Sequence, residues 1–308
     1  PTWAIAASVA FVMAVQGVSG VAKDLAKMSS KSAVKLLAPS EDGGLFRWVA
    51  LLTGSKNAVK GAGFFLGAVL LAVAGFEPAL WTMATVLSTI LIAVLLFLPK
   101  GLPGRMKSAE AWGGWRSPDA RINRLSLARL FLFGARDVWF VVGIPVYFQA
   151  VLSDGTPDSR RAAFFLIGGF LALWIIAYGA VQAMAPRILG GKAQPLTATT
   201  QKAALWSGLL VPIPFALAAL ALWAGDPAPW LTATLIVGLL AFGFVFAVNS
   251  SVHSYLILAF GQADRITRDV GFYYMANAAG RLIGTLLSGL SSVSYTHLRA
   301  HETKANLV

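Results

Sequence analysis

The stretch that decides the fold is RLFLFGARDVWFVVGIPVYF, residues 129–148, because it combines a long apolar run with three charges. A run of this length is typical of a helix that crosses a membrane, which needs about 20 mostly apolar residues. Arg129, Arg136 and Asp137 nevertheless lie inside it. A charge at mid-bilayer costs at least about 2.5–3.5 kcal/mol on insertion scales. The stretch therefore predicts a membrane helix whose charged side chains are sheltered from lipid.

The composition of the whole chain agrees with a membrane protein. The 308 residues are 57% hydrophobic and 12% charged, with a mean hydropathy of +0.71. Soluble domains carry about a quarter of charged residues, so these values indicate a polytopic membrane protein. The absence of cysteine from the sequence excludes disulfides and thiolate metal sites. We expect no cofactor and no metal. The sequence starts at Pro1, without an initiator methionine, and is interpreted as a fragment.

Eight apolar segments are long enough to cross about 30 Å of hydrocarbon at about 1.5 Å per residue. The predicted fold class is therefore all-α, a polytopic transmembrane helical bundle. The eight predicted spans are residues 3–22, 49–75, 79–98, 125–151, 162–186, 203–224, 229–259 and 270–290.

Basic residues are distributed unequally between the connections of these spans. Alternate connections carry 16 Lys or Arg residues on one side of the membrane and two on the other. By the positive-inside rule the first group is cytoplasmic. This asymmetry accounts for most of the net charge of +12 without nucleic acid as a partner. The longest connection, 99–124, is rich in Gly, Pro and basic residues and is predicted to link two helical bundles.

The last segment, SSVSYTHLRAHETKANLV at 291–308, abandons the membrane pattern. It resembles the translated read-through of a sequencing adapter, so we expect a non-native tail and exclude it from the site. His253 is then the one histidine left for consideration.

Five basic residues remain inside the predicted spans, and Asp137 is the one acid well inside any span. For Lys56 and Arg129, close to predicted cytoplasmic ends, we favour snorkelling to the headgroups. For Arg136, a structural ion pair with Asp137 or with another carboxylate remains an alternative. Lys60 and Arg281 lie too deep for easy snorkelling and predict a water-filled cavity. Because bases outnumber acids, that interior is expected to attract an anion.

Other polar and small residues recur at helical spacing. Tyr273 and Asn277 form a polar stripe with Arg281, and Asn249 forms another with His253. A satisfied structural histidine is the favoured interpretation of His253. Two pairs of glycines are spaced for close helix contact, namely Gly63 with Gly67 and Gly280 with Gly284.

A central basic connection, paired spans and glycine-rich helices resemble the major facilitator superfamily. QGVSG at 16–20 is similar to its fourth-helix motif, although Met13 stands where that motif has arginine, so the motif's proton-coupling role is not carried over. The resemblance implies an incomplete fold with about eight of twelve helices. Residues 1–98 would hold helices four to six of the N-terminal bundle, and 125–290 helices seven to eleven of the C-terminal bundle.

A narrower resemblance is to the organoarsenical efflux permeases of the ArsJ type. It is carried by SGVAKDLAKMSSKSAVKLL, LFRWVALLTGSKNAVKGAGFFLG, ARLFLFGARDVWFVVGIPV and FYYMANAAGRLIGTLLSG, and covers nearly all of 1–290. The resemblance implies export of 1-arseno-3-phosphoglycerate across the bacterial cytoplasmic (inner) membrane, which confers arsenate resistance. It also implies a functional link to a glyceraldehyde-3-phosphate dehydrogenase that makes this ester.

Together these observations predict a binding site for a strongly anionic small molecule, since arginine forms bidentate contacts with oxyanions and lysine acts as a point charge. Asp137 and His253 are the candidates for proton coupling or gating. The predicted substrate-binding residues are Lys56, Lys60, Arg129, Arg136, Tyr147, Tyr273, Asn277 and Arg281.

Two alternatives remain open. The same scaffold suits an organophosphate or organic anion antiporter, or a general efflux permease. A membrane-embedded enzyme would need clustered acids, a His/Asp set or a metal site, and the spans offer one deep acid and one histidine. We therefore expect a transporter and not an enzyme.

Overall fold

The computed structural model describes six stretches of the chain, residues 2–37, 44–97, 117–190, 195–225, 228–262 and 265–305, with side chains between 4 and 291. The ordered elements in these stretches are helices, without a strand among them, which confirms the predicted all-α class. They are α1 (Thr2–Leu37), α2 (Gly44–Ala74), α3 (Phe76–Phe97), α4 (Ala120–Val138), the π-helical segment η2 (Trp139–Gly143), α5 (Ile144–Leu152), α6 (Pro157–Ile188), α7 (Leu196–Leu210), α8 (Pro212–Ala224), α9 (Pro229–Phe260) and α10 (Ile266–Ala305).

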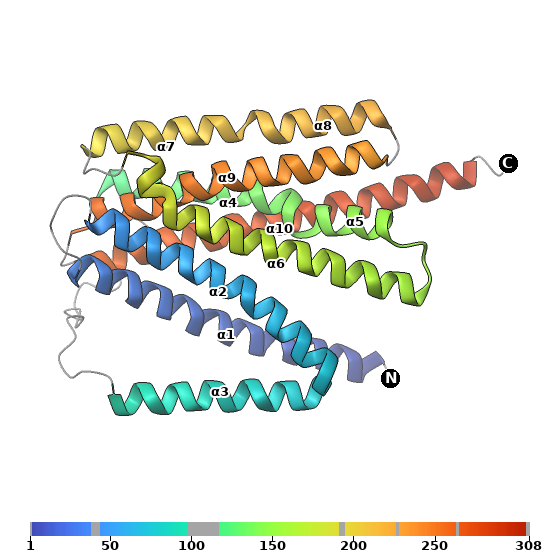
Figure 1. The fold of residues 1–308 in the computed structure, drawn as a ribbon, viewed down its shortest axis with the longest axis horizontal. Helices are drawn as coiled ribbons and strands as arrows, with labels where there is room; N and C mark the ends of the chain where they lie inside the picture. The colour runs from blue at the N-terminus through green and yellow to red at the C-terminus, as the bar shows by residue number, and fades with distance from the viewer. Residues whose placement is uncertain are drawn as a thin grey trace.

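The helices run along the long axis of the molecule, with α3 and α1 at one edge and α7 and α8 at the other (Figure 1). Within the described residues, seven segments are long and apolar enough to cross a membrane, since α4 with α5 and α7 with α8 each count as one. The predicted span at 270–290 lies inside α10, which is not among the seven. The chain is a multi-pass helical membrane protein.

The first helix is longer than the sequence predicts. The predicted first span ends at 22, whereas α1 continues to Leu37. Residues 23–37 of the basic segment assigned to a loop are therefore helical, and they include Lys23, Lys27, Lys31 and Lys35 at intervals of four. Residues spaced by four lie on one face of a helix, so these four bases form a stripe along the end of α1.

The helix α4 also begins earlier than predicted. Its first residue is Ala120, within the predicted linker 99–124, because Asp119 caps it by accepting a hydrogen bond from the backbone N–H of Arg121 at 2.8 Å. The side chain of Arg121 also donates to this carboxylate and lowers the pKa of Asp119. The rest of the predicted linker, up to 116, lies outside the described residues.

The first part of the predicted tail is helical, because α10 runs through 291 to Ala305, and its assignment as non-native stays a prediction. Residues 306–308 of the tail lie outside the described part of the chain, as do its side chains beyond 291.

Glycines set two close helix crossings. A Cβ at Gly280 would lie 2.1 Å from the carbonyl oxygen of Leu130, and one at Gly284 would lie 2.4 Å from that of Gly134. Side chains are therefore excluded where α10 packs along α4, which confirms the predicted contact of Gly280 and Gly284. For Gly63 and Gly67 the prediction is wrong, because a Cβ on either would meet nothing within 4 Å.

The second crossing joins α2 to α6. A Cβ at Gly54 would lie 2.4 Å from the carbonyl oxygen of Gly179, and a Cβ at Gly179 would lie 2.5 Å from that of Gly54. The two backbones thus touch at a reciprocal glycine contact. This crossing joins the predicted N-terminal portion of the chain to the predicted C-terminal one.

The π-helical segment η2 interrupts the fourth span and begins two residues after Asp137. Pro145 follows within two residues of its end and lacks the N–H that would bond to the carbonyl of Val141. The wider turn accommodates that missing bond, and the N–H of Ile144 bonds instead to the carbonyl of Trp139. Such single π turns occur frequently at functional sites.

The buried core is concentrated in the second half of the chain. At one end, Val49 of α2 packs with Ile122, Val252, Leu256 and Val270 from α4, α9 and α10. An aromatic cluster follows in the middle, built from Phe133, Trp174, Tyr178, Phe242 and Phe246. In contrast, α3 exposes most of its apolar side chains, among them Leu87, Leu91 and Leu95. An apolar surface of this kind is suited to lipid.

Candidate functional site

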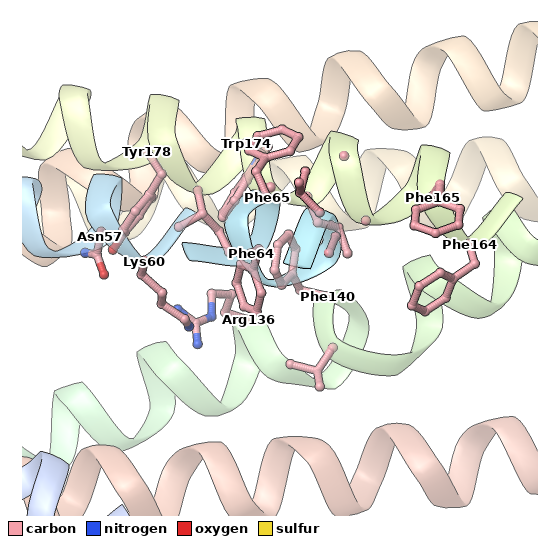
Figure 2. A pocket seen from close by; sticks show the side chains of 18 of the residues that line it. Asn57, Lys60, Phe64, Phe65, Arg136, Phe140, Phe164, Phe165, Trp174 and Tyr178 are labelled. Atoms are coloured by element: carbon pink, nitrogen blue, oxygen red, sulfur yellow. The ribbon is translucent and has the colours of Figure 1, made fainter. Parts of the chain in front are cut away.

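Three of the predicted bases line a single cavity. Lys60 comes from α2, Arg136 from the end of α4 and Arg281 from α10, and the cavity has a volume of about 630 Å³. Lys60 and Arg136 point toward one another across it, with Asn57 and Tyr178 beside them (Figure 2). Residues separated by more than 200 positions in the sequence thus meet in one place.

Asp137 is the counter-ion of the two arginines. Its carboxylate accepts hydrogen bonds from Nε of Arg136 at 2.6 Å and from Nε of Arg281 at 2.8 Å, each on a different oxygen. The Asp137 side chain is fully buried, whereas the Arg281 side chain is 44% exposed. The ion pair that was an alternative for Arg136 is therefore present, and it links α4 to α10.

Lys60 has a different environment. Within the described chain it has no acidic partner and no hydrogen bond, and its ammonium lies 5.6 Å from the ring centroid of Phe64. With one carboxylate against three bases, this end of the cavity carries a formal charge of +2. A charge imbalance of this kind inside a membrane helix bundle marks a functional site by default.

The opposite end of the cavity is apolar. Phe164 and Phe165 lie at the end away from Lys60 and Arg136, and the rings of Phe65, Phe140 and Trp174 lie between the two ends (Figure 2). The ring centroids of Phe140 and Trp174 are 4.5 Å apart. A cavity with cations at one end and aromatic rings along its walls can hold an organic anion in one orientation.

A network of neutral polar side chains extends from the cavity into the bundle. Asn57 donates a hydrogen bond to Gln182 at 2.5 Å, and Gln182 in turn donates to Tyr178 at 2.9 Å and to Ser250 at 3.3 Å. The sequence reasoning missed these residues. The signal was available, because Asn57 and Gln182 are polar residues inside apolar spans, but neither belongs to one of the two predicted polar stripes.

Arg129 ends this network and corrects a prediction. It is 5% exposed and does not reach toward the headgroups. Its Nε donates to Asn277 at 3.0 Å, its Nη1 donates to Ser250 Oγ at 3.1 Å, and its guanidinium lies 3.8 Å from the ring centroid of Phe133. Arg129 therefore sits between α4, α9 and α10 and not in the cavity.

The remaining predicted residues lie away from the cavity. Tyr273 packs against Arg129, 5.0 Å from its guanidinium. Tyr147 shares a hydrogen bond of 3.0 Å with Thr232 near the other end of the bundle. Lys56 is exposed one turn from Lys60, outside the set that lines the cavity. These positions could not be separated from the sequence, since the rotation of each helix was unknown.

His253 lies in a second cavity. It is 3% exposed and lines a space of about 700 Å³ between α4, α7 and α9, with Arg121 and Arg124 at its rim. His253 is therefore not in the cavity lined by Arg136 and Arg281, the two partners of the fully buried Asp137. Among the described residues, no group of three or more histidines and acids is placed to hold a metal ion.

Comparisons of the chain with family models, with curated proteins and with solved structures gave no match. The fold and the site thus define a class of protein, a multi-pass helical membrane protein with a cationic cavity between its helices.

Proposed function

We propose that this protein is an efflux transporter for an anionic organoarsenical, 1-arseno-3-phosphoglycerate, and that it confers arsenate resistance. The observation that carries the proposal is the meeting of Lys60, Arg136 and Arg281 at one cavity that offers a single carboxylate. The arsenical nature of the cargo rests on the resemblance to ArsJ-type permeases.

The cavity is suited to the chemistry of such a cargo. Phosphate, carboxylate and arsenate groups are oxyanions, which Arg136 and Arg281 bind as planar forks and Lys60 as a mobile point charge. Charge-assisted bonds of this kind contribute about 1.5–3 kcal/mol each. The volume of about 630 Å³ lies within the usual range of small-molecule sites.

Asp137 acts in this proposal as the counter-ion that the cargo displaces. Its carboxylate pairs with both Arg136 and Arg281 and offsets one of their two charges, so neither guanidinium is without a partner. An arriving oxyanion competes for both arginines, and the released carboxylate then takes up a proton or rotates toward Lys60. Asp137 is thereby a coupling residue for a proton-driven cycle.

Transport then follows alternating access of two groups of helices. α1 and α2 pack against α9 and α10 at the end that carries Arg47, Arg124 and Arg265, which we call the basic end. By the positive-inside rule the basic end faces the cytoplasm. Rocking about the Gly54–Gly179 crossing would open the cavity to one side at a time.

The test is arsenic uptake into inside-out vesicles that contain the full chain. A glyceraldehyde-3-phosphate dehydrogenase outside the vesicles makes the arseno-ester from arsenate. We expect arsenic to accumulate in the lumen only when this enzyme is active, and Arg136→Gln, Lys60→Gln and Arg281→Gln to remove most of the uptake at normal expression. Equal uptake by all three variants would exclude the cavity as the cargo site.

An organophosphate or organic anion antiporter on the same scaffold is the second candidate function. It is favoured by the same bases, since phosphate and arsenate esters present similar oxyanions. Competition separates the two: an excess of 3-phosphoglycerate abolishes arsenic uptake if the protein is a general organophosphate exchanger, and reduces it only partly if the arseno-ester is preferred.

A further inference from the structure

The stripe of lysines on α1 leads to a second cluster of bases near the basic end. Lys27 and Lys31 both lie over the ring of Tyr274 of α10, with ammonium-to-centroid distances of 5.7 and 5.4 Å. Ser32 accepts a hydrogen bond from Thr267 at 3.3 Å in the same contact. Two cations from one helix therefore converge on one aromatic side chain of the other.

Lys31 is the residue that this arrangement leaves unexplained. It is 5% exposed, and its ammonium has no hydrogen-bond partner in the described part of the chain. The nearby acid Asp24 is already paired with Lys27. Among the described residues, the charges that act on Lys31 most strongly are positive and belong to Arg129, Lys56 and Lys27.

A buried ammonium without a partner is costly, because burial removes its hydration and supplies no hydrogen bond in exchange. The stacking on Tyr274 offsets only part of this cost, since such contacts contribute about 0.5–2 kcal/mol. The cost is removed when an anion is added to the cluster. Lys56, which is exposed one turn before Lys60, extends the cluster toward the cavity.

We propose that Lys27, Lys31 and Lys56 form an entry site for oxyanions, which captures the phosphate or carboxylate group of the cargo at the basic end before it reaches the cavity. This inference rests on the proposed transport function. The site takes small organic anions with phosphate, arsenate or carboxylate groups. The ring of Tyr274 contacts the ammonium groups of both Lys27 and Lys31.

The spacing of the bases suits a stepwise passage. The axial spacing between neighbouring lysines is about one helical turn, about 6 Å. It applies to the pair Lys31 and Lys27 on α1 and to the pair Lys56 and Lys60 on α2. Each step is comparable to the size of one oxyanion group. A cargo with two such groups can therefore contact Lys56 with one group while the other engages Lys60.

The test exploits the absence of cysteine from the sequence. In the vesicle assay, the full chain with Lys31→Cys is compared with the same variant after aminoethylation, which restores a positive charge, and after S-methylation, which does not. Because position 31 is buried, both reactions are carried out in an unfolding detergent before reconstitution, and mass spectrometry confirms that they are complete. Lys35→Cys, on the same face one turn further along, is the matched control. The readouts are kcat/KM and the maximal rate of arsenic uptake.

We expect Lys31→Cys to lower kcat/KM about tenfold with a maximal rate within about twofold of wild type, because charges at an entrance act on capture. Aminoethylation should restore kcat/KM, and S-methylation should not. An unchanged kcat/KM in Lys31→Cys, or equal recovery after S-methylation, would overturn the entry site. The proposed function would still stand in that case, provided that the wild-type chain takes up arsenic. A wild-type chain that takes up no arsenic would refute that function and this inference together.

Discussion

Asp137 accepts hydrogen bonds from arginines of two helices and is fully buried. At the residue scale, the cost of a charge in lipid was enough to predict from the sequence a cavity that Lys60, Arg136 and Arg281 line together. The prediction for Arg129 was wrong because α4 begins at Ala120, so that this residue lies deeper than the sequence indicated. The depth of a residue within a helix can be predicted only as accurately as the two ends of that helix.

The substitution Asp137→Asn tests the ion pairs directly. It leaves Arg136, which is mostly buried, beside Arg281 without a carboxylate. We expect the free energy of unfolding to fall by about 3 kcal/mol, since breaking a buried pair leaves an uncompensated charge. Thermal unfolding in detergent measures the loss, and added 3-phosphoglycerate should recover part of it. Wild-type stability of the variant would show that the pair does not hold α4 and α10 together.

At the scale of helices, apolar length located the spans closely, and the predicted span 229–259 differs from α9 by one residue. The sequence predicts a loop after residue 22 because four lysines follow it, whereas α1 continues to Leu37. Charge ends a membrane span but does not end a helix, and lysine is a good helix former. The π turn after Asp137 was also missed, although Pro145 was its signal.

The crossing of α2 and α6 gives a prediction at this scale. In Gly179→Val a Cβ would lie 2.5 Å from the carbonyl oxygen of Gly54, so the two helices must move apart. We expect a loss of about 1–3 kcal/mol in stability together with a loss of arsenic uptake. The matched control is Gly63→Val, where a Cβ would meet nothing within 4 Å. The crossing is not a pivot if both variants transport like wild type.

The turn before α6 gives a pH-dependent prediction. The carboxylate of Asp154 accepts hydrogen bonds from the hydroxyl of Ser159 and from the N–H and hydroxyl of Thr156. These bonds, that of Ser159 most strongly, lower the pKa of Asp154 to about 2. Because the folded-state pKa lies below the usual value, this turn is fully stabilised at neutral pH, and the stabilisation is lost as the pH falls through about 4 toward 2.

The measurement is the hydrogen-exchange protection of the first turn of α6, corrected for the intrinsic pH dependence of exchange. Protection should stay constant down to about pH 4 and then decline. Asp154→Asn should reduce it already at pH 7 and remove the decline. A variant with wild-type protection at pH 7 would show that the carboxylate does not hold the turn.

At the scale of the whole molecule, the sequence predicted a bundle of membrane helices with a basic end. The starts of α2, α4 and α10, near which the basic residues of the predicted cytoplasmic connections lie, are at one end of the bundle, and the start of α6 is at the other (Figure 1). The sequence could not predict which faces meet. That outcome depends on glycine contacts such as Gly54 with Gly179, between residues distant in the chain. The shape and aromatic wall of the cavity follow from these contacts.

The central claim is that the cavity binds an organic oxyanion through its three bases. It is tested most directly by calorimetric titration of the full chain with 3-phosphoglycerate, for the wild type and for Lys60→Gln, Arg136→Gln and Arg281→Gln. We predict that each substitution weakens binding at least about tenfold, the equivalent of one charge-assisted hydrogen bond. Arg124→Gln, which removes a base outside this cavity, should bind like wild type. Equal affinity in all five proteins would contradict the account.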